Sequence, residues 1–291
     1  MPFNGHSLVG ELKRVLVCSP QAAGWDGPAA SKWHDFGFLH APNFAVAQAQ
    51  HEELCRQLQA AGAEVSHLPT SPDLTLDAAY THDPSFATDY GLLVMNPGKK
   101  NRVLEARLHS EFCKSIGMPL FAGIEPPGTT EAGDIVWLDS KTLLIGNGLR
   151  TNRAGITQMQ GLFSPHGIEV LSAPLPYGMG PSACLHLMSM MSMLDERTVL
   201  VDLPWLAVET VQLLQSRGFS FVEIETSERD TLACNVLALG GRRLLAIEQN
   251  RKTNAKLRAA GFDVQTFSGD ELCVNGGGGP TCLTRPLLRG D

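Results

Sequence analysis

The sequence of 291 residues lacks most of the signals that would place it in a familiar class. No apolar run is long enough to cross a membrane, and the N-terminus lacks the apolar segment of a secretory signal. Basic runs are short and the net charge is −7, which argues against a nucleic-acid partner. We therefore expect a cytoplasmic protein that binds neither a membrane nor nucleic acid.

Signatures of cofactor and metal sites are also missing. There is no Walker A loop, no GxGxxG turn after a strand and no GxSxG nucleophile turn. The seven cysteines are scattered and form no CxxC pair, which disfavours both a disulfide framework and a zinc site. The expectation is a protein with no metal and no cofactor.

What the chain does contain is an internal repeat. AGDIVWLDSKTLLIG from Ala132 and ACNVLALGGRRLLAI from Ala233 match position by position, and each predicts a strand, a tight turn and a second strand. A helix-like stretch follows each of them, at 151–162 and 250–260. Each stretch then ends at a glycine followed by a predicted strand, an arrangement typical of a helix C-cap.

The same register recurs elsewhere in the chain. Asp83, Asp134 and Asn235 each stand nine residues before a leucine of the second strand, and 193–201 is a weaker copy of the hairpin. A unit with its own helix that returns about every 50 residues indicates an array of α/β units.

A fifth unit would form if Glu271–Leu287 closed against the N-terminal strand Arg14–Cys18. The predicted fold is therefore a five-bladed, pseudo-symmetric α/β propeller of ββαβ units, with residues 1–291 in one domain. In such a ring equivalent strand ends converge near the axis, where a site would gather residues from distant parts of the chain.

The segment NGGGGPTCLTRPLL, residues 275–288, presents Cys282 after four glycines. Consecutive glycines cost backbone entropy on folding and have no side chains to pack, so they indicate a close approach of the backbone to another group. The Cys282 thiol is a candidate nucleophile; the alternative is a buried structural cysteine after a flexible turn.

Other reactive residues lie at the starts of the repeat units. Asp83 occurs in THDPSF, Glu131 and Asp134 in TEAGDI, and His186 in ACLHLM. Taken singly, Asp83 can be a turn former, Asp134 a backbone cap and His186 a core histidine. Their related places in separate repeats favour one shared site. A thiolate nucleophile, a histidine acid–base and a carboxylate that orients the histidine form a coherent set.

Two aspartates, Asp77 and Asp83, are surplus to such a triad and suggest a cationic substrate group with several donors. A guanidinium fits because it is planar, stays charged and pairs bidentately with carboxylates. Arg102 in PGKKNR and Arg150 in GLRTNR follow two of the hairpins. Either arginine can hold a carboxylate, the alternative being ordinary surface charge.

The order and spacing of these motifs, from RVLVCSP at 14–20 to CLTRPL at 282–287, resemble the guanidino-group-modifying (pentein) superfamily. That superfamily comprises arginine deiminases, amidinotransferases and dimethylarginine dimethylaminohydrolases, and its fold is a five-bladed α/β propeller. The pattern is most similar to the dimethylarginine dimethylaminohydrolases. The resemblance implies a small-molecule guanidino substrate and no cofactor or metal.

The resemblance also implies roles for the substrate-binding residues. By the family pattern Asp77 and Asp83 hold the guanidinium, while Arg102 of PG-x3-R and Arg150 of RTN bind the substrate carboxylate. Asp134 of the [DE]-x-G-D motif is included with the substrate-binding residues.

The implied catalytic residues are Cys282, His186 and Glu131. Cys282 attacks the guanidinium carbon, His186 protonates the leaving amine and later activates water, and Glu131 orients His186. The reaction passes through a covalent thiouronium intermediate, and a methylated arginine would yield citrulline and dimethylamine.

Two positions depart from the family patterns. Deiminases and amidinotransferases carry H-x-D after the histidine, where this chain has Met188, yet GGGGPTC is closer to the deiminase tail than to the VDG segment of the hydrolases. Arginine deiminase-like hydrolysis and a non-catalytic guanidine- or amino-acid-binding propeller are therefore the alternatives. A homodimer is compatible with the sequence.

Overall fold

The computed structural model describes residues 3–181, 183 and 185–290. Within these residues the strands form five three-stranded sheets. In four sheets an antiparallel hairpin leads through a helix to a third strand, which pairs in parallel with the second. The four sheets are β3 (Ser85–Thr88), β4 (Gly91–Val94) and β5 (Leu120–Gly123); β6 (Ile135–Asp139), β7 (Thr142–Asn147) and β8 (Glu169–Pro174); β9 (Met191–Met193), β10 (Thr198–Val201) and β11 (Ser220–Glu223); and β12 (Leu237–Gly240), β13 (Arg243–Ile247) and β14 (Asp263–Phe267).

The fifth sheet joins the two ends of the chain. β15 (Arg285–Arg289) pairs antiparallel with β1 (Leu12–Val17), and β1 pairs in parallel with β2 (Glu64–His67). The C-terminal strand thus takes the place that the first hairpin strand has in the other sheets. This confirms the predicted five-bladed α/β propeller and its closure. Each sheet with its helix is called a blade below.

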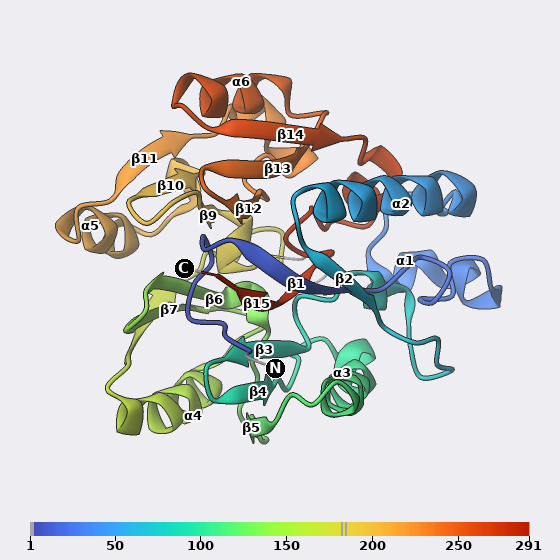
Figure 1. Ribbon diagram of the computed structural model, residues 1–291, viewed down its shortest axis with the longest axis horizontal. Coiled ribbons are helices and arrows are strands. Elements are labelled where there is room, and N and C mark those ends of the chain that lie inside the picture. Colours follow the sequence, from blue (N-terminus) through green and yellow to red (C-terminus); the bar gives the residue numbers. More distant parts are fainter. Residues whose placement is uncertain (1–2, 182, 184, 291) are drawn as a thin grey trace.

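The α-helices lie around the rim of the ring, while β3, β6, β9, β12 and β15 lie toward its centre (Figure 1). The α-helices are α1 (Trp33–Phe36), α2 (Phe44–Ala60), α3 (Val103–Ser115), α4 (Arg153–Phe163), α5 (Val208–Ser216) and α6 (Arg251–Ala259). Short helical turns are η1 (Pro28–Lys32), η2 (Leu76–Ala79), η3 (Lys100–Arg102), η4 (Ala132–Asp134), η5 (Ser164–His166), η6 (Leu187–Ser189), η7 (Leu203–Trp205), η8 (Thr226–Thr231) and η9 (Asp270–Val274). Among the described helices, none combines the length and the apolar character needed to cross a membrane.

Local sequence explains where the repeated helices begin and end. The Asn152 side chain accepts a hydrogen bond from the Gly155 N–H and caps α4, as expected for asparagine at this position. After the helical turns, Gly167 and Gly261 have φ angles of 67° and 87°, the left-handed conformation that ends a helix at low cost. Both predicted helix-like stretches are confirmed to within about two residues.

The middle strands explain the apolar runs of the sequence. Leu143, Leu144 and Ile145 of β7 are fully buried, as are Leu244 and Leu245 of β13. A strand covered on both faces needs apolar residues at successive positions rather than at alternate ones. The apolar clusters between neighbouring sheets and helices therefore fix each blade against the next.

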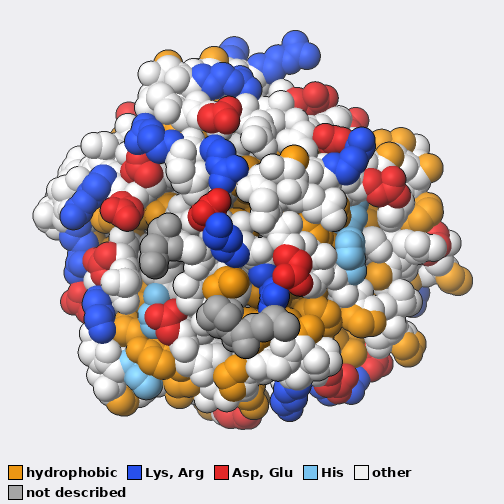
Figure 2. All heavy atoms as spheres, viewed as in Figure 1, with side chains coloured by type: hydrophobic (Ala, Val, Ile, Leu, Met, Phe, Trp, Pro, Cys, Tyr) orange, Lys and Arg blue, Asp and Glu red, His pale blue; other side chains and the backbone are white. Residues whose placement is uncertain are grey.

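The two ends of the inner strands have different characters. The residues that precede β3, β6, β12 and β15 gather at one end of the ring axis, and the hairpin turns lie at the other. Figure 2 shows Lys and Arg side chains interspersed with Asp and Glu on the face in view. The described part of that face therefore presents no continuous basic surface of the kind that binds a nucleic-acid backbone.

Candidate active site

A buried carboxylate–histidine pair lies at the starts of two blades. Glu131 precedes η4 and His186 precedes η6, and the Oε2 atom of Glu131 is 2.7 Å from Nε2 of His186. Burial opposes a charge on Glu131, but the hydrogen bond to His186 and the charge of that histidine lower the pKa of the Glu131 carboxyl. An ionised acid that holds one ring nitrogen is the arrangement that orients a histidine for proton transfer.

Asp83 faces the same histidine from a third blade. Its Oδ1 atom lies 4.0 Å from Nδ1 of His186 and accepts a hydrogen bond from the Gly133 N–H at 3.0 Å. Its Oδ2 atom pairs with Arg102 at 2.6 Å. Although burial disfavours its charge, His186 and Arg102 lower the pKa of the Asp83 carboxyl. Asp83 is therefore an ionised group directed at the centre of the site.

Asp83, Glu131 and His186 offer ligand atoms that lie within 4.8 Å of one another, a spacing that a cation could bridge. The same atoms already make direct contacts, because Glu131 is hydrogen-bonded to His186 and Asp83 is paired with Arg102. The set is therefore a histidine hydrogen-bonded to one carboxylate and facing a second. Its members come from separate repeats, in the manner predicted from the register.

Cys282 lies in the turn before β15 and differs from the other described cysteines. Its backbone carbonyl accepts a hydrogen bond from the N–H of His82, the residue before Asp83, at 3.0 Å. Its Sγ atom accepts one from Nδ2 of Asn235, also at 3.0 Å. Cys282 is partly exposed, whereas five other cysteines are buried and burial raises the pKa of each: Cys18, Cys55, Cys113, Cys234 and Cys273. Cys184 lies outside the described residues.

The four-glycine run explains how this thiol is placed. A Cβ atom on Gly276 would lie 1.8 Å from the Tyr80 hydroxyl, and one on Gly278 would lie 2.4 Å from the Tyr80 ring. A Cβ on Gly279 would meet the Asn235 side chain at 2.7 Å. The backbone therefore passes directly against Tyr80 and Asn235, which only glycine permits. The prediction of a close backbone approach is confirmed.

Asp77 lies in η2, near the site but paired with another residue. Both of its carboxylate oxygens contact the Nζ atom of Lys99, at 2.7 and 2.9 Å. The backbone N–H of Lys99 donates to Oε1 of Glu131 at 3.0 Å. Lys99 therefore links Asp77 to the acid that is hydrogen-bonded to His186.

Arg102 is buried and held by two carboxylates. It pairs with Asp83, and its Nε atom donates to Glu105 at 2.9 Å. Burial raises the pKa of Glu105 to about 7, although the charge of Arg102 opposes the shift. In this structure the Arg102 guanidinium is directed at these acids, so binding a substrate carboxylate would require an exchange of partners.

Arg150 contacts Glu131, and Asp134 contacts the backbone of the residue after His186. Arg150 donates to Oε2 of Glu131 at 3.5 Å and to the Ala183 carbonyl at 3.4 Å. Asp134 accepts a hydrogen bond from the Leu187 N–H at 2.9 Å, and burial raises the pKa of its carboxyl to about 6. Asp134 is thus tied to the segment that carries His186.

Three residues of this site were absent from the predicted set: Lys99, Glu105 and Asn235. The register offered a signal for Asn235, because it occupies the repeat position of Asp83 and Asp134. Its Oδ1 atom accepts from the Thr281 N–H at 3.0 Å, so the amide holds both the thiol and its turn. Lys99 and Glu105 carried no such signal, since lysine and glutamate are ordinary surface residues in sequence.

Met188, at the position where the H-x-D pattern expected of deiminases would have an aspartate, is buried in an apolar cluster with Leu187 and Met190. It therefore offers no second carboxylate beside His186. A cationic group in this site would therefore have to be held by other carboxylates, such as Asp83.

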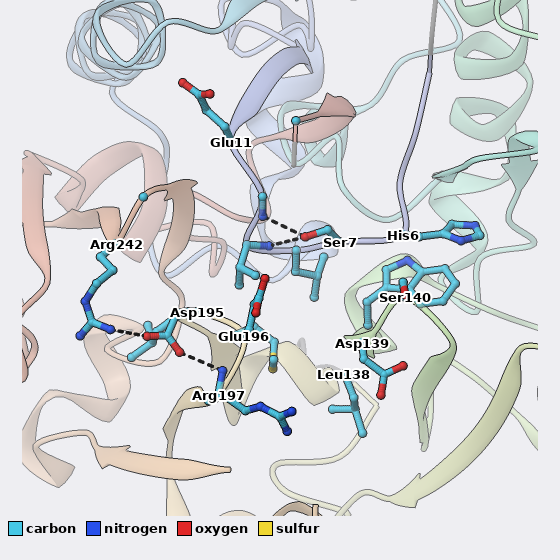
Figure 3. A pocket seen from close by; sticks show the side chains of 18 of the residues that line it. His6, Ser7, Glu11, Leu138, Asp139, Ser140, Asp195, Glu196, Arg197 and Arg242 are labelled. Carbon is cyan, nitrogen blue, oxygen red and sulfur yellow. Dashed lines mark hydrogen bonds and ion pairs between the residues drawn. The ribbon is translucent and has the colours of Figure 1, made fainter. Parts of the chain in front are cut away.

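A cavity of about 1310 Å³ lies away from these residues. Figure 3 shows it between the N-terminal segment around Ser7 and hairpin turns that carry Asp139, Glu196 and Arg242. None of the predicted site residues lines it. The turns follow the first strand of each hairpin and the site residues precede it, so a strand of about five residues separates the two places by roughly 17 Å.

The sequence matches the family described as N,N dimethylarginine dimethylhydrolase, eukaryotic, over residues 40–289. An N(G),N(G)-dimethylarginine dimethylaminohydrolase of Pseudomonas aeruginosa is 27% identical over 254 residues, covering 87% of this chain and 91% of the relative. An arginine deiminase of Listeria innocua is 24% identical over 257 residues, covering 73% of this chain and 61% of that protein.

Comparison of the fold with solved structures finds the same Pseudomonas aeruginosa enzyme as the sequence comparison. A solved structure of a cysteine-to-serine mutant of the Pseudomonas aeruginosa enzyme, complexed with citrulline, superposes with a TM-score of 0.76 at 25% identity, covering 96% of this chain and 100% of that one. The five-bladed fold, the family match over residues 40–289 and the similarity to these relatives all indicate the same family. The chain belongs to the N,N-dimethylarginine dimethylhydrolase family and is a hydrolase of the pentein superfamily.

Proposed function

We propose that this hydrolase cleaves a guanidino C–N bond of an arginine derivative, with a methylated arginine yielding citrulline and dimethylamine. The observation that carries the proposal is the buried Glu131–His186 hydrogen bond of 2.7 Å beside Asp83. The names of the Pseudomonas relative and its complex with citrulline support the choice of substrate.

The proposed reaction begins with Asp77 and Asp83 on the substrate guanidinium. Cys282 attacks the guanidinium carbon as a thiolate, and its hydrogen bond from Asn235 holds the sulfur in place. His186 gives a proton to the departing amine as the C–N bond breaks, leaving a thiouronium on Cys282. Proton transfer by a positioned histidine contributes on the order of 10² to 10⁴ in rate.

The second half of the reaction returns the thiolate. His186 takes a proton from water, whose oxygen adds to the thiouronium carbon. The C–S bond then breaks with departure of the Cys282 thiolate, and the new hydroxyl loses its proton to solvent to give the ureido product. Glu131 orients His186 and stabilises it whenever it carries the proton, because Glu131 is held ionised in a buried position. Arg150 is assigned to the far carboxylate of the substrate. Arg102 takes the same role only if it exchanges its present partner, Asp83. Asp134 contacts the substrate only if it leaves the Leu187 N–H.

Arginine deiminase-like hydrolysis, with release of ammonia, is the second candidate. The likeness to the Listeria innocua deiminase favours it, and the apolar surroundings of Met188 count against it. A non-catalytic guanidine-binding propeller has no use for a partly exposed thiol or for a histidine hydrogen-bonded to a buried carboxylate. A cytoplasmic location and a homodimer stay predictions.

The test is incubation of the protein with arginine, methylated arginines and agmatine, with detection of the ureido product and the released amine. We expect turnover of at least one methylated arginine and its loss in Cys282→Ser, because an alcohol is far less ionised than a thiol near neutral pH. Turnover by Cys282→Ser within about tenfold of wild type would remove covalent catalysis by this residue.

A further inference from the structure

Lys99 places a positive charge inside the candidate active site. Its Nζ atom lies 2.7 and 2.9 Å from the two oxygens of Asp77 and 3.0 Å from the backbone oxygen of Phe36 in α1. Asp77 is only 5% exposed. The ammonium therefore neutralises a buried carboxylate, and its removal without a replacement would leave an uncompensated buried charge.

This contact conflicts with a substrate cation on the same carboxylate. The proposed function needs Asp77 for the guanidinium, and the ammonium of Lys99 now uses both of its oxygens. If a guanidinium replaces the ammonium, the charge at Asp77 stays balanced. The Lys99 side chain is 21% exposed, so the displaced ammonium is partly desolvated and gains from a new anionic partner.

The surroundings of Lys99 indicate where that partner is. A Cβ atom on Gly98 would lie 2.6 Å from the Arg150 carbonyl oxygen, so the two main chains are in direct contact. Glu131 accepts from the Lys99 N–H with one oxygen and from the Arg150 guanidinium with the other. Lys99 and Arg150 thus flank the same acid. A lysine has a flexible four-carbon stem and can redirect its ammonium.

We propose that Lys99 is a specificity-determining residue that leaves Asp77 when the substrate guanidinium arrives and pairs with the substrate carboxylate beside Arg150. A zwitterionic arginine derivative supplies both a cation for Asp77 and an anion for Lys99. A guanidine that lacks the carboxylate displaces Lys99 without compensation. The site therefore selects amino-acid substrates by an exchange of ion pairs. This inference rests on the proposed function.

The experiment compares Lys99→Met with Lys100→Met, the neighbouring and exposed lysine. Calorimetry in the Cys282→Ser background measures the affinities for arginine and for agmatine, which lacks the carboxylate. Turnover of the same pair is measured with Cys282 intact. Lys99→Met should lower the arginine-to-agmatine affinity ratio by roughly ten- to a hundredfold, the size of one lost hydrogen bond to a charged group. Agmatine should bind more tightly than in wild type, because Asp77 is no longer paired. Lys100→Met should leave the ratio unchanged.

Three results separate the possibilities. An unchanged ratio, or an equal loss for both ligands, would overturn the inference, since Lys99 would then only fasten α1 over Asp77. A shifted affinity ratio without any ureido product from wild type, with methylated arginines included among the substrates, would support the inference and refute the proposed hydrolysis. Failure of the Cys282→Ser protein to bind arginine, a methylated arginine or agmatine would overturn both.

Discussion

Gly133→Ala is expected to disable the site while leaving the fold intact. Gly133 lies in η4, between the two blades that supply Glu131 and Asp83. A Cβ atom there would lie 2.6 Å from Nδ1 of His186 and 2.8 Å from Oδ1 of Asp83. Contacts between non-bonded heavy atoms are favourable at about 3.5–4.0 Å, so the added methyl group must push each of these side chains away by roughly 1 Å.

The two consequences differ in size. Inserting a methyl group into a packed region costs typically about 1–3 kcal/mol of stability, which a folded protein of this size can tolerate. A displacement of about 1 Å in a catalytic group can cost on the order of a hundredfold in rate. We therefore expect a fall in kcat of roughly a hundredfold with a cooperative unfolding transition that is retained.

The assay is formation of ureido product, with unfolding by denaturant measured in parallel. Gly161→Ala is the matched control, because no heavy atom outside its own helix lies within 4 Å of a Cβ at that position. It lies in α4, where replacing glycine by alanine should stabilise the protein by about 0.5–1 kcal/mol. Activity of Gly133→Ala within about threefold of wild type would refute the assigned positions of His186 and Asp83.

Three further changes test other parts of the site. Arg150→Ala should lower kcat/KM for arginine-type substrates roughly ten- to a hundredfold and leave agmatine-type substrates almost unchanged; equal effects would assign Arg150 to structure. Asn235→Ala should lower kcat roughly three- to tenfold, because Sγ of Cys282 loses a hydrogen-bond donor; an unchanged kcat in single-turnover kinetics would contradict this. Glu105→Gln should flatten the pH dependence of stability. Burial raises the pKa of Glu105 to about 7, so the folded state keeps a proton that the unfolded chain loses, and wild-type stability should fall by roughly 2–3 kcal/mol between about pH 5 and pH 8. Denaturant unfolding that shows the same fall in Glu105→Gln would exclude this carboxyl as its source.

The repeat determined most of the fold at the level of sequence. Matching hairpins at Ala132 and Ala233 predicted β6–β7 and β12–β13, and the helices and glycine ends that follow them were predicted as well. Closure of β15 on β1 followed from the same register. Local patterns of this kind are readable because strand and helix periodicity, turn residues and capping act over a few neighbouring positions.

The sequence also determined which residues were candidates for chemistry. Asp83, Glu131 and His186 stand at equivalent places in separate repeats, and the structure brings their ligand atoms within 4.8 Å of one another. The glycine run before Cys282 predicted a close approach of the backbone. Its partners, Tyr80 and Asn235, are almost 200 and about 40 residues away in sequence, so only the folded chain identifies them.

Tertiary structure alone decided how charge is distributed within the site. Lys99 on Asp77, and Arg102 on Asp83 and Glu105, are pairings that no sequence pattern predicted. The same is true of the burial that leaves Cys282 partly exposed while five other cysteines are covered. Which ion pairs form, and which thiol is reachable, depends on distances and desolvation between segments far apart in the chain, and a linear pattern contains neither quantity.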